Sequence, residues 1–139
     1  LAGSSYWQIH AALAEALAMG PQIDAIATAR LLETEIKRQD REAQTGTPRT
    51  VDLRVVISWL QRWMHDAIRL RLTQTIGYHR SALDGLHRVA GMPVARLMGF
   101  QDWLNDAARQ ASHPVNVQLF LEDCLMRYRA LFDANTKSA

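Results

Sequence analysis

The chain has 139 residues, a formal net charge of +2 and a hydrophobic fraction of 48%, values that are typical of one globular domain. They exclude a mostly disordered chain, and no stretch is apolar for long enough to span a membrane. The single cysteine, Cys124, excludes an internal disulfide and a cysteine-rich metal site, so we expect a reduced, cytoplasmic setting. Because the chain begins with Leu1 rather than Met, we expect it to be the C-terminal part of a longer protein.

Two helices are predicted before residue 44. Ser5 and Gln8 have the spacing of a capping box, which predicts a helix over residues 5–19. Gly20 is a stop signal, and Pro21 fits the first turn of a second helix. That helix carries the apolar residues Ile23, Ile26, Ala27, Leu31, Leu32 and Ile36, and the i,i+4 pairs Glu33 with Lys37 and Arg38 with Glu42 support its exposed side. Residues 40–50, DREAQTGTPRT, have no apolar period and predict a flexible loop.

The longest helix is predicted over residues 51–75, with Thr50 as its cap. Its buried face comprises Val56, Leu60, Trp63, Ala67 and Leu70, and Trp59 widens that face. The polar side is expected to hold Arg54, Ser58, Gln61, Arg62, His65, Asp66 and Arg69.

Three more helices are predicted in the C-terminal half. The first is short, from Ser81 with Asp84 to Gly91, and the second begins at Pro93. The second is expected to turn inward Val94, Leu97, Met98, Leu104, Ala107, Ala108 and Ala111. His113-Pro114 separates it from a final helix, capped by Asn116 and covering about residues 117–133. We therefore predict an all-α fold, a single compact bundle of five to six helices.

The final helix has apolar residues on two sides. One stripe comprises Val117, Phe120, Leu121, Cys124, Leu125 and Tyr128, which recur at steps of three and four. Leu119 and Met126 lie outside this stripe, among Gln118, Glu122 and Arg129. Either the helix is central in the bundle, or its second side contacts another protein.

Catalytic patterns are absent from the sequence. There is no phosphate-binding glycine loop and no dinucleotide-binding fingerprint. The histidines have no paired-ligand spacing, and the neighbours His65 and Asp66 point about 100° apart on a helix. Cys124 lies on an apolar stripe. We expect no catalytic residues, no cofactor, no metal and no small-molecule substrate.

Arginine is unusually common and unevenly placed. It accounts for fourteen of the sixteen basic residues, a bias that a GC-rich genome would also produce. Arg54, Arg62 and Arg69 are candidate nucleic-acid contacts, because guanidinium groups bind phosphates well. Four tryptophans, Trp7, Trp59, Trp63 and Trp103, could stack on bases or lie in the core.

Three segments resemble a known family: VVISWLQRWMHDAIRLRL (55–72), IGYHRSALDGL (76–86) and HPVNVQLFLEDCLMRYRALF (113–132). Together they are similar to the C-terminal collar domain of the bacterial DNA polymerase III delta-prime subunit, the stator of the sliding-clamp loader. The residues that match the most specific motif are His113, Pro114, Asn116, Leu119, Leu121, Glu122, Asp123, Leu125, Arg127 and Tyr128. Residues 1–49 match only as a helical pair.

The resemblance implies a non-catalytic oligomerisation domain that acts in DNA replication. Such a domain holds its subunit in the pentameric ring, with the delta and tau or gamma subunits as partners and only weak or indirect contact with DNA. The family's zinc module and arginine finger lie in an upstream AAA+ region and match nothing here. We take Leu119, Met126, Arg129 and Trp103 as candidate subunit-interface residues. The alternative is an all-α nucleic-acid-binding module that uses the arginine-rich segment 54–96. A third, a freestanding helical enzyme or ligand-binding bundle, has less support.

Overall fold

The structure is a computed structural model that describes residues 2–73, 83–111 and 116–133. These residues form helices and no strand, which confirms the predicted all-α class. The elements are α1 (Ala2–Ala18), the 3-10 turn η1 (Gly20–Gln22), α2 (Ala25–Ala43), α3 (Leu53–Thr73), α4 (Leu83–Ala90), α5 (Val94–Gln110) and α6 (Val117–Ala130).

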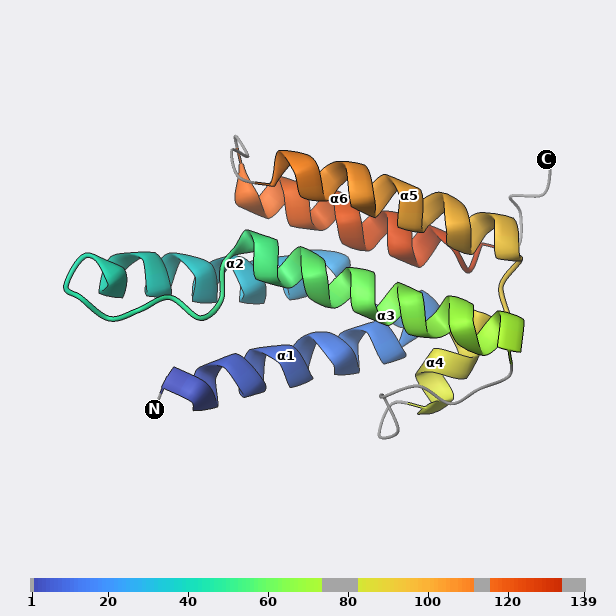
Figure 1. The fold of residues 1–139 in the computed structure, drawn as a ribbon, viewed down its shortest axis with the longest axis horizontal. Helices are drawn as coiled ribbons and strands as arrows, with labels where there is room; N and C mark the ends of the chain where they lie inside the picture. Colours follow the sequence, from blue (N-terminus) through green and yellow to red (C-terminus); the bar gives the residue numbers. More distant parts are fainter. Residues whose placement is uncertain (1, 74–82, 112–115, 134–139) are drawn as a thin grey trace.

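The helices pack as a bundle around α3 (Figure 1). α3 contacts α5 on one side and the short α4 on the other, and α2 packs along α6. α5 and α6 run antiparallel. The start of α5 lies beside the end of α6, where Arg96 donates a 2.9 Å hydrogen bond to the Leu131 carbonyl. α6 packs against α2, α5 and the turn η1.

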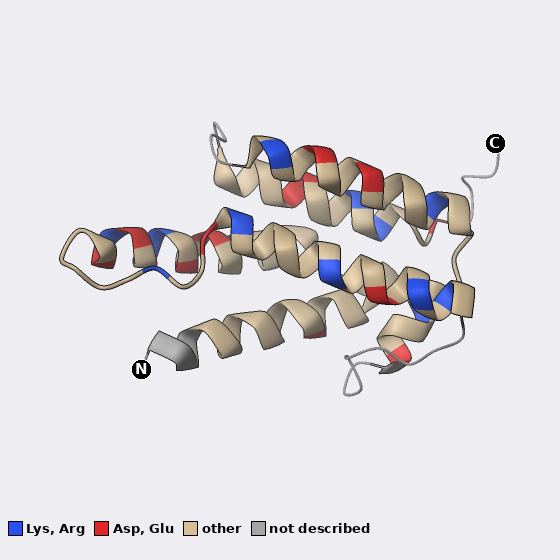
Figure 2. Ribbon diagram, viewed as in Figure 1, with Lys and Arg blue, Asp and Glu red and all other residues tan. Residues whose placement is uncertain are grey.

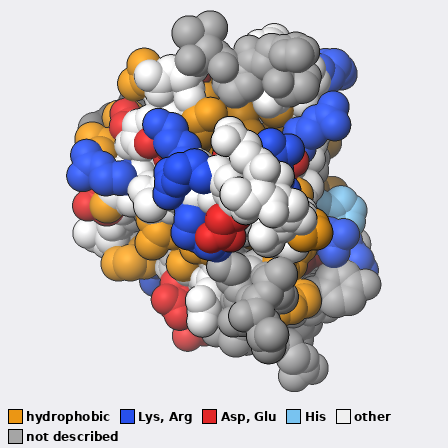
Figure 3. Space-filling model, turned by 90° about the vertical axis from the view of Figure 1, so that its left-hand side faces the viewer, with side chains coloured by type: hydrophobic (Ala, Val, Ile, Leu, Met, Phe, Trp, Pro, Cys, Tyr) orange, Lys and Arg blue, Asp and Glu red, His pale blue; other side chains and the backbone are white. Residues whose placement is uncertain are grey.

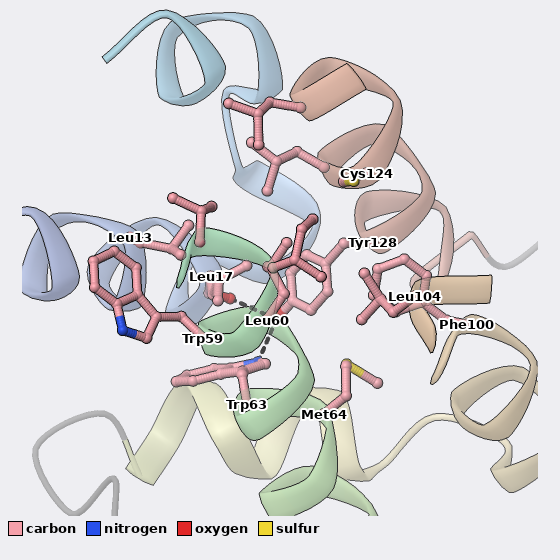
Figure 4. Close-up of a cluster of buried hydrophobic side chains, with 14 of the residues drawn as sticks. Leu13, Leu17, Trp59, Leu60, Trp63, Met64, Phe100, Leu104, Cys124 and Tyr128 are labelled. Atoms are coloured by element: carbon pink, nitrogen blue, oxygen red, sulfur yellow. Dashed lines mark hydrogen bonds between the residues drawn. The ribbon is translucent and has the colours of Figure 1, made fainter. Parts of the chain in front are cut away.

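The core is built on the predicted stripe of α3. Trp63, Leu60 and Val56 are buried, and so are Leu121, Leu125 and Tyr128 of α6. Trp63 donates its indole N–H to the Tyr128 hydroxyl at 3.1 Å, and that hydroxyl donates to the Leu17 carbonyl at 2.7 Å (Figure 4). This relay joins α3, α6 and α1 inside the core, where polar groups are stable only when hydrogen-bonded.

The close approach of α1 and α4 depends on a glycine. A Cβ atom on Gly85 would lie 2.4 Å from the Ala18 Cα, closer than any real contact. Arg88 of α4 also donates a 3.0 Å hydrogen bond to the Ala18 carbonyl, where the last carbonyls of α1 have no partner within the helix. The short helix α4 is thus held against the end of α1.

Two predicted helix starts are wrong. α1 begins at Ala2, so Ser5 lies inside it and is not its N-cap. Pro21 opens the turn η1 rather than a helix, and α2 begins later because Asp24 caps it, accepting a 3.0 Å hydrogen bond from the Ala27 N–H. The ion pairs of Glu33 with Lys37 and Arg38 with Glu42 are present as predicted.

α2 also turns a different set of side chains inward. Ile26 and Leu31 are exposed, while small Ala25 and Ala29 are buried together with Leu32 and Ile36. The buried residues step by four, three and four along one face, which is the helical period. The small alanines allow α2 to lie close to its neighbours.

The start of α3 is held by residues that the sequence did not indicate. Asp52, not Thr50, caps the helix, and its carboxylate accepts a 2.9 Å hydrogen bond from the Val55 N–H. The first residues of the predicted loop 40–50 belong to α2, which ends at Ala43. The buried Gln39 side chain accepts from the N–H groups of Thr50 and Val51, both at 2.8 Å.

Two predictions of which side chains face the core need correction. Asp66, predicted on the polar side of α3, is only 1% exposed, because it lies three residues after Trp63 and four before Leu70 and so shares their face. Met98 of α5 is exposed, and Phe100 takes the buried position.

Asn116 caps α6 as predicted, accepting a 2.9 Å hydrogen bond from the Leu119 N–H. The predictions for Ser81, His113 and Pro114 lie outside the described residues.

Candidate interaction surface

The outer side of α6 carries two large apolar residues. Leu119 is 60% exposed and Met126 is 45% exposed, while Leu121, Cys124, Leu125 and Tyr128 on the opposite side are buried. Leu119 and Met126 are seven residues apart, close to two helical turns, so they share this side. Between the two alternatives for α6, the structure favours the one in which the helix is not central and its second side faces outward.

The other predicted interface residues lie on opposite flanks of these two. Trp103 of α5 is half-buried and stacks on Phe100, with ring centroids 6.2 Å apart and planes 10° from parallel. Arg129 is exposed on α6, three residues after Met126, so the two are neighbours on the helix surface. Arg129 therefore adjoins the outer side of α6, whereas Trp103 belongs to another helix.

An open groove of about 470 Å³ lies between α5 and α6, beside the outer side of α6. Its lining residues are Arg96, Gly99, Phe100, Trp103, Arg127, Ala130 and Leu131. The Arg127 guanidinium lies 4.4 Å from the centroid of the Trp103 ring, a cation–π contact. Of these lining residues, the sequence analysis proposed only Trp103 as an interface residue. A signal for the groove was available in the sequence, because Phe100 and Trp103 are three residues apart and follow a glycine inside a predicted helix.

The candidate nucleic-acid residues form a row on α3. Arg54, Arg62 and Arg69 are exposed, and the helical period turns them to one side of the helix. Figure 2 shows basic residues spaced along α3. The spacing of the three arginines, eight and seven residues, separates their Cα atoms by about 12 Å and 10 Å. Within the described part of the chain, none of the three forms an ion pair. Basic side chains also spread over the end of the molecule where α2 leads into α3, with acidic ones between them (Figure 3).

The tryptophans divide between core and surface. Trp63 and Trp59 are buried, as expected for the core alternative, but Trp7 of α1 is 66% exposed. Trp7 contacts Tyr6 edge to face, with centroids 5.0 Å apart. Tyr6 in turn accepts a 3.3 Å hydrogen bond from the Trp59 indole. Trp7 is thus an exposed aromatic side chain in contact with a half-buried tyrosine.

Reactive groups are poorly placed for chemistry. Burial raises the pKa of the Cys124 thiol to about 12, so the nucleophilic thiolate is scarce near neutral pH. His65 Nδ1 lies 3.9 Å from Asp66 Oδ1, too far for a hydrogen bond. The described residues contain no group of three or more potential metal ligands, and none of their helices is long and apolar enough to cross a bilayer.

Comparisons of the chain with models of protein families, with curated proteins and with solved structures give no match. The geometry of the surface therefore carries the functional argument.

Proposed function

We propose that this chain is a non-catalytic assembly domain. The observation that carries the proposal is the exposure of Leu119 and Met126 on the outer side of α6. Exposed apolar side chains that cluster mark contact surfaces, because their contact with water is unfavourable and burial against a partner removes it. The Cys124 thiol is buried, which fits a packing role for this side chain.

We further propose that the assembly is the clamp loader of DNA polymerase III, with this chain as the collar domain of a delta-prime subunit. The support is the motif around α6. Asn116 caps this helix, Leu121, Leu125 and Tyr128 fill the core, and Leu119 of the same motif faces outward. A collar domain needs both a core face and a contact face. Its partners are then the delta and the tau or gamma subunits.

The test is reconstitution. The purified chain is mixed with delta and tau or gamma subunits and examined by size-exclusion chromatography with light scattering. We expect co-elution that persists as salt is raised, because apolar contacts are not screened. Separate elution at every concentration would contradict the proposal.

A second candidate function, binding of nucleic acid, has the arginine row of α3 in its favour. Arg54, Arg62 and Arg69 are exposed and without ion pairs in the described part of the chain. Its test is the salt dependence of binding to a labelled DNA duplex. A row of phosphate contacts predicts an affinity that falls steeply with salt and is lost in the triple Arg→Gln variant. An affinity for DNA that does not change with salt concentration would exclude this function.

A further inference from the structure

We infer that the groove between α5 and α6 binds an acidic, apolar peptide segment of a partner protein. The inference rests on the proposed assembly function and names the chemistry of one contact. Two observations carry it: an aromatic floor, formed by Phe100 and Trp103, and two arginines on the walls, Arg96 and Arg127.

The floor suits an apolar side chain. Phe100, which is 5% exposed, stacks on the half-buried Trp103, and the Arg127 guanidinium lies 4.4 Å from the Trp103 ring centroid, so the exposed part of the Trp103 indole supplies the apolar surface. Gly99 keeps the space above this surface open, since a Cβ atom at that position would meet nothing within 4 Å. A leucine or aromatic side chain of a partner would cover this surface and exclude water from it.

The walls suit a carboxylate. Arg127 donates from Nε to Asp123 at 2.9 Å, and in the described part of the chain its terminal Nη groups donate no hydrogen bond. Those groups can bond both oxygens of a carboxylate. Arg96 is anchored by 2.9 Å hydrogen bonds from Nη1 to the carbonyls of Leu131 and Asp133. Asp123 pairs with Arg127 and offsets part of its charge, but none of the described lining residues is acidic, so the two arginines still favour an acidic partner.

The shape favours a peptide over a small ligand. Small-molecule sites enclose most of their ligand, whereas this groove is open along its length. Its wall residue Ala130 lies about one helical turn after Met126, so the groove borders the outer side of α6. A protein segment can occupy the groove while its parent domain covers Leu119 and Met126.

The experiment is selection from a random-peptide display library on the immobilised chain, followed by fluorescence polarisation of the selected peptides. We expect selected sequences with Asp or Glu next to a leucine or aromatic residue. The matched variants are Gly99→Leu, which fills the groove, and Gly99→Ala, which does not. Both replace a helix-interior glycine and should keep the helix intact.

Expected results are a loss of affinity of about tenfold or more in Gly99→Leu and in Arg127→Gln, with Gly99→Ala unchanged. Arg109→Gln is the matched charge control, because Arg109 also pairs with an aspartate, Asp106, but lies outside the groove. Replacing the peptide acids by amides should weaken binding in the same way.

Three outcomes would overturn the inference. One is selection of sequences without acids, and another is equal binding to the wild type and Gly99→Leu. The third is self-association of the chain that Gly99→Leu abolishes, which would make a second copy the occupant. If Gly99→Leu binds peptide as the wild type does and still joins the delta and tau or gamma subunits, the inference about the groove fails while the proposed assembly function stands.

Discussion

Tyr128 connects three helices through one hydroxyl group. It accepts from Trp63 and donates to the Leu17 carbonyl, and burial raises its pKa, so the group stays neutral and able to donate. Tyr128→Phe should lower the free energy of unfolding by about 1–3 kcal/mol, since buried polar partners lose a hydrogen bond. Tyr6→Phe is the control, because its hydroxyl serves only a 3.3 Å bond near the surface. Urea denaturation measures both, and equal effects would contradict the relay's importance.

Trp63 is the largest fully buried side chain. Trp63→Ala should destabilise the fold by about 3–5 kcal/mol, because it removes apolar contacts and leaves a cavity. Trp7→Ala, at a 66% exposed position, should change the midpoint of denaturation little. A midpoint of Trp63→Ala close to that of the wild type would show that the core does not depend on this ring.

Cys124 should resist thiol reagents in the folded protein. Its side chain is buried and its pKa is raised to about 12, so access and thiolate are both limited. Iodoacetamide labelling followed by mass spectrometry should proceed slowly at pH 8 and quickly in denaturant. Rapid labelling without denaturant would mean that α6 opens readily.

At the scale of elements, the connection between α2 and α3 is controlled by Gln39. Gln39→Met removes the acceptor for the Thr50 and Val51 N–H groups and the 2.7 Å bond to Glu35. We expect a loss of about 2–4 kcal/mol and faster proteolysis between α2 and α3, because buried donors are left without partners. Gln44→Met, at an exposed position, is the control. Unchanged proteolysis in Gln39→Met would show that the Gln39 hydrogen bonds do not hold the segment between α2 and α3 in place.

The helical period predicted most elements, and the wrong predictions arose where the charge or small size of a residue was given more weight than its position in the period. The core stripe of α6 and the Asn116 cap followed from spacing alone. Asp66 was assigned to the polar side for its charge, although its position in the period is inward. Ala25 and Ala29 were overlooked because small side chains carry a weak apolar signal, yet they allow close helix packing.

The candidate site was predicted only in part, and for a physical reason. Exposure of Leu119 and Met126 could be inferred from a single helix, because both positions lie outside its stripe. The groove could not be inferred from a single helix, since it forms where α5 packs against α6. The same packing places Arg127 of α6 over the Trp103 ring of α5. Contacts between two helices depend on how the helices pack, and the residue pattern within one helix does not predict that packing.

Exposed apolar residues occur on several sides of the whole molecule. Besides Leu119 and Met126 they include Trp7 on α1, Ile26 and Leu31 on α2, and Met98 on α5. A subunit inside a ring contacts two neighbours and needs more than one such surface. Under the proposed collar role, one of these other sides would contact the second neighbour.

The most direct measurement of that role uses the double variant Leu119→Glu/Met126→Glu. In the free chain the new carboxylates lie in water, whereas in an interface they would be desolvated and unpaired, at a cost of several kcal/mol. Gln44→Glu/Gln110→Glu is the control, because it adds the same charge at exposed positions.

Size-exclusion chromatography with the delta and tau or gamma subunits is run beside a thermal melt of each variant alone. We predict an unchanged melt and loss of co-elution for Leu119→Glu/Met126→Glu, with the control assembling normally. Unfolding of the double variant by itself, or assembly equal to that of the control, would contradict the assignment of this side of α6 as the contact surface.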